Sequence, residues 1–361
     1  MMRSAEIVRE AWRNTRGGVS RPILSMVLLA LIVGSAAWIQ VVSVVQVNRD
    51  ADRWRSVGAS ISIVAFEGRI DGAKCDALSG TPGIAKSGAL RAGESVELAV
   101  LPSTSFATFE GSPGLAHLLG VVGDDARGAW AASDLADRLG ASAFSSKQVS
   151  TVKDETLLIG GQYHYPEDGR LPILAYTLVS PVPAQGRFDT CWVEVWPEDK
   201  AVEELVTYPA VSDGAASEEL KPTVTQLNGS EGRSFSGQDR LDRIPFQLLL
   251  SVSFAGSLLL GAGLTWARRL EVANALHAGA DKVSLAAQNA LEAVIWGVPA
   301  LALVCAGSLL LAFADNPGSP WPALLSGGAI TAAGFSGLLF GASAGSMAVS
   351  EKRLFRYFKT R

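Results

Sequence analysis

Four apolar runs constrain this sequence more than any other feature, because each is long enough to cross a membrane. The runs are residues 22–45, 245–267, 291–314 and 322–349. A helix needs about 20 residues to span the roughly 30 Å hydrocarbon core of a bilayer. The mean hydropathy of +0.25 is high for a soluble protein and indicates a membrane protein that also carries a large soluble part. We therefore predict four transmembrane helices.

The spacing of the runs predicts one span, then a folded domain, then three spans. Between the runs lie an N-terminal arm, an outer domain, a loop, a short outer turn and a basic tail, at residues 1–21, 46–244, 268–290, 315–321 and 350–361. The basic residues of the arm, the loop and the tail all fall on one side. The positive-inside rule places that side, with both termini, in the cytoplasm. The first run exceeds the usual length of a signal-peptide core, so we expect it to be retained.

The long segment outside the membrane alternates strand-like runs with short helical pieces, which predicts an α+β domain. Helices are expected at 71–78, capped by Asp71, and at 133–139, capped by Ser133 and closed by Gly140. Strands are expected at 60–66, 84–90, 96–101, 148–152, 156–159, 173–179 and 191–196. Cys75 and Cys191 both lie in this domain, where a disulfide is permitted, although two free thiols fit the sequence equally well.

The loop at residues 268–290 has a helical pattern of its own. Leu270, Val272 and Leu276 recur at helical spacing, and Gly279 follows where a helix would end. This pattern is typical of an amphipathic connector, or of a helix that receives a push from a cytoplasmic partner. The N-terminal arm also predicts an amphipathic helix, which either lies on the membrane surface or simply supplies basic residues that orient the first span.

The last apolar run contains three glycines at i, i+4 and i+8: Gly337, Gly341 and Gly345. Small residues on one face of a spanning helix allow a second helix to approach closely. We predict a helix-packing face there, within the subunit or between subunits.

Several classes of chemistry lack their sequence signatures. There is no GxxxxGK[ST] phosphate loop and no GxSxG nucleophile elbow. The three histidines lie far apart with no metal-ligand spacing, and the acid-rich middle of the chain disfavours nucleic-acid binding. The apolar runs hold almost no ionisable side chain, which disfavours an ion-coupled carrier. We expect no catalytic residues, no metal and no bound cofactor in this chain.

Two parts of the sequence resemble MacB-like and FtsX-like ABC permeases, the type VII ABC superfamily. The loop residues 268–273 (RRLEVA) and 275–280 (ALHAGA) are similar to the cytoplasmic loop of that family, although Ala273 stands where the family usually has glycine. In the outer domain, residues 81–84 (TPGI) and 136–140 (ADRLG) resemble turns of the MacB-like core.

The resemblance implies a permease subunit in a bacterial plasma membrane, without a fused ATPase. It implies two copies of a separate ABC ATPase that binds ATP and magnesium, and a second permease subunit, identical or related. The contact with the ATPase is expected at Leu270, Glu271, Val272, Leu276 and Gly279.

ATP hydrolysis would then move the outer domains, a mode of action called mechanotransmission, to export or extract a peptide, an antibiotic or a lipoprotein-like substrate. Two alternatives remain open: an FtsX-like regulator of a cell-wall hydrolase, and a membrane sensor without transport. For Glu271, the rival interpretation is an ion pair within its own loop.

Overall fold

The computed structural model describes residues 4–18, 21–123, 127–141, 147–197, 200–211 and 221–353. Most of the predicted basic tail, from residue 354 on, lies outside these residues, as does the segment 212–220. The chain forms two compact units. The helical unit comprises Met1–Asp52 and Gly237–Arg361, and the sheet unit comprises Arg53–Ser236.

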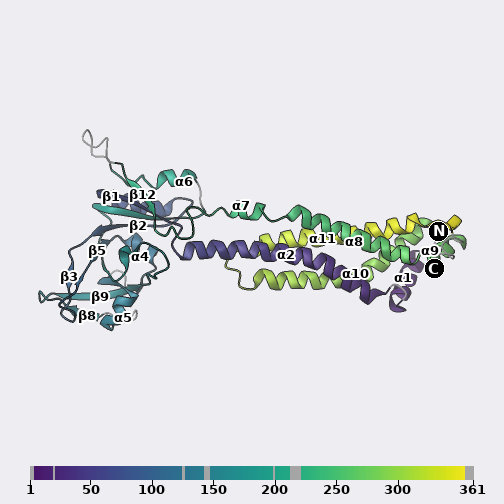
Figure 1. The fold of residues 1–361 in the computed structure, drawn as a ribbon, viewed down its shortest axis with the longest axis horizontal. Helices are drawn as coiled ribbons and strands as arrows, with labels where there is room; N and C mark the ends of the chain where they lie inside the picture. The colour runs from purple at the N-terminus through teal and green to yellow at the C-terminus, as the bar shows by residue number, and fades with distance from the viewer. Residues whose placement is uncertain are drawn as a thin grey trace. The chain divides into compact units, whose positions relative to one another are not determined.

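The helical unit, drawn in Figure 1, contains the four helices that are long and apolar enough to span a membrane. Its elements are α1 (Ser4–Arg16), α2 (Pro22–Ser56), α7 (Gly237–Asp242), α8 (Phe246–Ala267), α9 (Arg269–His277), α10 (Lys282–Phe313), α11 (Trp321–Ala348) and the 3-10 turn η3 (Glu351–Arg353). By length and apolar composition, α2, α8, α10 and α11 can each cross a membrane. The predicted order of one span, a domain and three spans is confirmed.

Two of these helices extend well past their apolar runs, because helix formation continues outside the hydrocarbon core. The helix α2 continues to Ser56, and α10 begins at Lys282 rather than at the first apolar residue. Asp281 starts α10 by accepting hydrogen bonds from the backbone N–H of Ser284 at 3.0 Å and from its hydroxyl at 2.7 Å. These two bonds lower the pKa of Asp281. The predicted loop 268–290 is therefore largely helical.

The sheet unit is built on one mixed ten-stranded sheet, in the order β12-β1-β11-β2-β5-β10-β7-β9-β6, with β8 paired to β9. Among the strands of the described residues, only the β5–β10 and β7–β9 pairs are parallel. The strands of the sheet are β1 (Ile61–Asp71), β2 (Ile84–Ala92), β5 (Thr108–Gly111), β6 (Val122–Gly123), β7 (Ala129–Ala132), β8 (Lys147–Ser150), β9 (Thr156–Tyr163), β10 (Leu178–Pro181), β11 (Arg187–Val195) and β12 (Thr223–Gln226). A separate two-stranded ribbon pairs β3 (Val96–Glu97) with β4 (Ser105–Phe106).

Short helices and 3-10 turns accompany the sheet. They are α3 (Gly72–Ala77), η1 (Leu78–Gly80), α4 (Pro113–Leu119), α5 (Ser133–Leu139), η2 (Pro172–Leu174) and α6 (Lys200–Leu205). The predicted cap of α3 is confirmed, because the Asp71 carboxylate accepts the Lys74 backbone N–H at 3.1 Å. The left-handed Gly140, with φ of 64°, closes α5 as expected.

Three local predictions are wrong. Ser133 is the first helical residue of α5 rather than its cap, and its hydroxyl lies 3.4 Å from Nδ1 of His164. The strand predicted at 173–179 starts only at Leu178, since Pro172 opens a 3-10 turn. The strand predicted at 96–101 ends after Glu97, because the next residues form a turn.

The disulfide between Cys75 and Cys191 is formed, with 5.9 Å between the two Cα atoms. It ties α3 to β11 across 116 residues of sequence. Both sulfurs lie in a fully buried cluster that also contains Ile70, Phe188 and Val193. The bond therefore joins two elements that already share a core.

Candidate functional site

The short helix α9 presents two different faces. Val272 and Leu276 are buried in an apolar cluster with Ala273, Leu285 of α10 and Val349, which follows α11. This cluster fixes α9 to the ends of two spans. The exposed positions of α9 and of the turn after it are Glu271, Asn274, His277, Ala278 and Gly279.

The residues predicted to contact an ATPase therefore divide into two groups. Leu270 is half-buried, whereas Glu271 and Gly279 are exposed. Val272 and Leu276 are buried, so in this chain they mainly support α9 from beneath. Gly279 has a φ of +97°, a conformation that favours glycine, and the turn at this residue ends α9.

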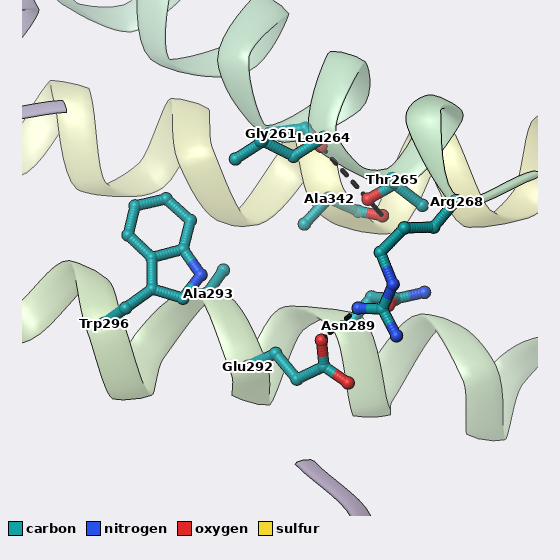
Figure 2. Close-up of a pocket in the computed structure, with 9 residues that line it drawn as sticks. All are labelled: Gly261, Leu264, Thr265, Arg268, Asn289, Glu292, Ala293, Trp296 and Ala342. Atoms are coloured by element: carbon teal, nitrogen blue, oxygen red, sulfur yellow. Dashed lines mark hydrogen bonds and ion pairs between the residues drawn. The ribbon is translucent and has the colours of Figure 1, made fainter. Parts of the chain in front are cut away.

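A buried ion pair lies just before the start of α9, and Figure 2 shows its members, Arg268 and Glu292. The Arg268 guanidinium, at the junction of α8 and α9, pairs with the carboxylate of Glu292 in α10. The Glu292 side chain is only 3% exposed, and that of Arg268 is 18% exposed. Arg268 also donates from Nε to Glu271 at 2.8 Å.

Glu292 gathers two further donors. Nδ2 of Asn14 in α1 donates to Oε1 of Glu292 at 2.8 Å, and Nε2 of Gln288 lies 3.3 Å from the same oxygen. Burying a carboxylate is costly unless its oxygens are paired and hydrogen-bonded, and these contacts meet that need. We call Arg268, Glu292, Asn14 and Gln288 the polar node. It joins α1, the α8–α9 junction and α10 at one point.

The electrostatics of the polar node keep Arg268 charged. Burial acts to lower the pKa of Arg268, but the Glu292 carboxylate and the Glu271 hydrogen bond outweigh it and raise the pKa above its ordinary value. In the structure, Glu271 thus pairs with Arg268 of its own loop, which agrees with the alternative interpretation of Glu271 as a member of an ion pair within the loop. The side chain of Glu271 remains 56% exposed in its salt bridge with Arg268, so its carboxylate can still bind a further cation.

Two cavities adjoin the polar node. One of about 30 Å³, roughly the room of one water molecule, is lined by residues that include Thr265, Arg268, Glu292 and Trp296. The other, about 380 Å³, is a groove among α1, α9 and α10. Its polar lining includes Glu10, Asn14, Glu271 and Gln288, and its apolar lining includes Val272, Ala275, Ala278, Ala280 and Leu285. Such a groove suits a protein segment that carries an apolar and a basic side chain.

The predicted glycine face of α11 lies against α8. A Cβ placed on Gly337 would lie 2.2 Å from the carbonyl oxygen of Phe254, and one on Gly341 would lie 2.1 Å from that of Leu258. A Cβ on Gly345 would lie 3.0 Å from Thr265. The two backbones therefore approach as closely as glycine allows.

Sequence reasoning missed the polar node. Glu292 and Asn14 were assigned no role, although an acidic residue at the start of an apolar run is an unusual signal. An ionisable side chain at the end of a span is expensive to bury and so calls for a partner.

Comparisons with known proteins found distant likenesses in structure. No protein-family model matches the sequence, and no curated protein matches it. The periplasmic region of MacB from Actinobacillus actinomycetemcomitans is similar at a TM-score of 0.34 and 11% identity, over 50% of this chain and 94% of that one. The extracellular domain of the ABC-type transporter YknZ from Gram-positive bacteria is similar at a TM-score of 0.28 and 11% identity, over 46% of this chain and 99% of that one.

Proposed function

We propose that this chain is the permease subunit of an ABC transporter of the MacB/FtsX type. The observation that carries the proposal is α9: a short helix between two spans, fixed on one face and exposed on the other, whose sequence resembles the cytoplasmic loop of that family. The four spans in the order one, domain, three are consistent with it. The basic residues of this loop favour a cytoplasmic location, with the sheet unit outside.

In this proposal, a separate ABC ATPase binds ATP and magnesium and contacts α9 through Leu270, Glu271 and Gly279. Two ATPase copies act on two permease subunits, identical or related. Closure of the ATPases pushes α9, and the buried cluster around Val272 and Leu276 passes that push to α10 and to the end of α11. The polar node makes α10 move with α9, because a buried ion pair resists separation, and the hydrogen bond from Asn14 to Glu292 couples α1 to the same point.

The movement of the spans then opens and closes the outer domains on a substrate. Peptides, antibiotics and lipoprotein-like molecules are the substrates that the family resemblance suggests, for export or for extraction from the membrane. The sheet unit, Arg53–Ser236, has the size of a MacB-like core rather than of the smaller FtsX domain, which supports transport or extraction over hydrolase control.

Co-purification from the native membrane tests the proposal. The full chain is tagged and solubilised gently, and the proteins that remain bound are identified by mass spectrometry. We expect an ATPase with a phosphate loop in stoichiometric amount, together with a second permease if the complex is heterotypic. A bound cell-wall hydrolase, with or without an ATPase, would refute transport in favour of the FtsX-like regulator, and a bound kinase without an ATPase would refute it in favour of a sensor.

Charge reversal at Glu271 tests the contact itself. We expect Glu271→Arg to abolish stimulation of the ATPase by the permease, because it removes the exposed carboxylate and places a cation beside Arg268. Glu351→Arg, at an exposed acidic residue of η3, is the matched control. If both variants stimulate the ATPase as strongly as the wild type, the ATPase does not bind at Glu271.

A further inference from the structure

The amphipathic helix α1 is attached to the helical unit by one face only. Ala11 is completely buried, and Asn14 on the same side donates to Glu292 of α10. Val8 and Trp12 lie about 60° and 100° around the helix from Ala11 and are 55% and 58% exposed. Two large apolar side chains one turn apart are thus left uncovered beside the occupied face.

Three arginines lie next to this apolar pair on the same outward face. At about 100° per residue, Trp12 lies about 40° around the helix from Val8, and Arg16, Arg9 and Arg13 follow at about 80°, 100° and 140°. All three arginines are exposed. Arg13 also contacts Glu10 at 2.7 Å, while its side chain remains 77% exposed. Glu6, at about 160°, is also exposed, so the outward face is apolar on one side and carries three cations and one anion on the other.

The chain places this face close to the membrane surface. The helix α1 ends at Arg16, and α2 begins at Pro22, so the link between them reaches at most about 20 Å when fully extended. The first apolar residue of α2, Ile23, is 78% exposed and faces the lipid in a spanning helix. Asn14 meets α10 at Glu292, where the apolar run of that span starts. The helix α1 thus lies at the depth where two spans enter the bilayer.

We propose that the outward face of α1 is a binding surface for anionic phospholipid headgroups. Val8 and Trp12 enter the boundary between headgroups and acyl chains, where tryptophan is favoured, and Arg9, Arg13 and Arg16 bind the phosphates. Arginine suits this role because its planar guanidinium binds phosphate oxygens in pairs. Neutral lipid would accept the apolar pair but leave the arginines without net negative charge to bind. The proposal needs only the spans and does not depend on an ATPase.

Lipid on one face of α1 has a consequence for the other. Asn14 connects α1 to Glu292, and Glu292 holds Arg268 at the start of α9. The charge of the surrounding lipid is thereby linked, through α1, to the position of the loop helix.

A fluorescent label on α1 tests the proposal in the full chain. Cys305 is the one free cysteine among the described residues, because Cys75 and Cys191 are bonded, so Cys305→Ser with Val8→Cys gives a single labelling site. The protein carries an NBD group there in nanodiscs of phosphatidylcholine, alone or mixed equally with phosphatidylglycerol. Emission and quenching by lipid-borne nitroxide report whether residue 8 contacts lipid.

The second variant replaces the three arginines of α1 with glutamine. Each basic residue near an anionic surface contributes roughly fivefold to binding, so we expect the surface-bound state to weaken by roughly 25- to 125-fold, the lower value applying if Glu10 already neutralises Arg13. The control variant, Lys153→Gln with Lys221→Gln and Arg233→Gln, removes three exposed cations from the sheet unit.

We expect a blue-shifted, quenchable label with phosphatidylglycerol, and a loss of both signals in the arginine variant but not in the control. Equal burial of the label in neutral and anionic nanodiscs would overturn the proposal, since apolar contact alone would then suffice. A label exposed to water in both lipids would also overturn it and would assign the surface to a protein partner.

Discussion

Replacing Gly341 with alanine tests the packing of α11 on α8. The new methyl group would lie 2.1 Å from the backbone carbonyl oxygen of Leu258, whereas real Cβ contacts essentially never fall below 3.0 Å. The two helices must therefore separate by about 0.9 Å at this point. No side-chain rotation can relieve the clash, because the atom that is struck belongs to the backbone.

The expected cost follows from two opposing terms. Overpacking a tight interface costs about 1–3 kcal/mol, and replacing glycine by alanine within a helix returns up to about 1 kcal/mol. We expect Gly341→Ala to lower the free energy of unfolding by about 1–2 kcal/mol, or about tenfold in the folding equilibrium. Gly328→Ala in the same helix is the matched control, because nothing lies within 4 Å of its Cβ position.

The assay is equilibrium unfolding of the full chain in mixed micelles, followed by helical circular dichroism as the denaturing detergent fraction rises. Gly341→Ala should unfold at a lower fraction than wild type, and Gly328→Ala at the same or a higher fraction. Identical midpoints for the two variants would refute the close approach of α8 and α11, and with it the packing role of the glycine face.

Three further predictions follow from buried pairs and groups. Removing only one member of the buried pair, by Arg268→Met or Glu292→Leu, should lower the free energy of unfolding by up to about 3 kcal/mol. The double variant should lose less than the sum of the two single losses. Additive losses in the same micelle assay would argue against the pair. Reduction of the Cys75–Cys191 disulfide should lower the stability of the sheet unit by about 2–5 kcal/mol, because the bond closes a loop of 116 residues. Thermal scans with and without reductant measure this loss, with the double serine variant as the reference. Unchanged scans would contradict the prediction. Burial raises the pKa of Tyr165 to about 12. The contribution of Tyr165 to stability is therefore complete below about pH 10 and is lost as the pH rises from 10 to 12. Tyr165→Phe should flatten that part of the curve of stability against pH, and an unchanged slope would refute the raised pKa.

The spans could be predicted from the sequence because the bilayer acts on composition and length alone. A run such as 322–349 has to be apolar whatever it packs against, and α11 occupies almost the same residues. The cap of α3 could be predicted equally well, since the Asp71 carboxylate needs only the backbone N–H of Lys74, three residues further along the chain. Both features are set by local chemistry or by the solvent.

Contacts between distant residues could not be predicted in this way. Asn14 and Glu292 are 278 positions apart, and their hydrogen bond depends on how α1 lies on α10. The apolar pattern of α9 was recognised, but which of its residues face inward depends on Leu285 and Val349, which lie on other elements. Ser133 shows the same limit on a smaller scale, because a serine can cap a helix or begin one.

The sheet unit begins and ends on neighbouring strands. The strand β1, which follows α2, pairs antiparallel with β12, which precedes α7 and α8, and Ser62 lies opposite Gln226. The polypeptide therefore enters and leaves this fold through adjacent positions at one edge of the sheet. A fold with its ends together can be inserted into a host chain, removed from it or exchanged for another without changing the spacing of the helices on either side. The sheet unit of such a protein can thus diversify as a cassette while the spans stay the same.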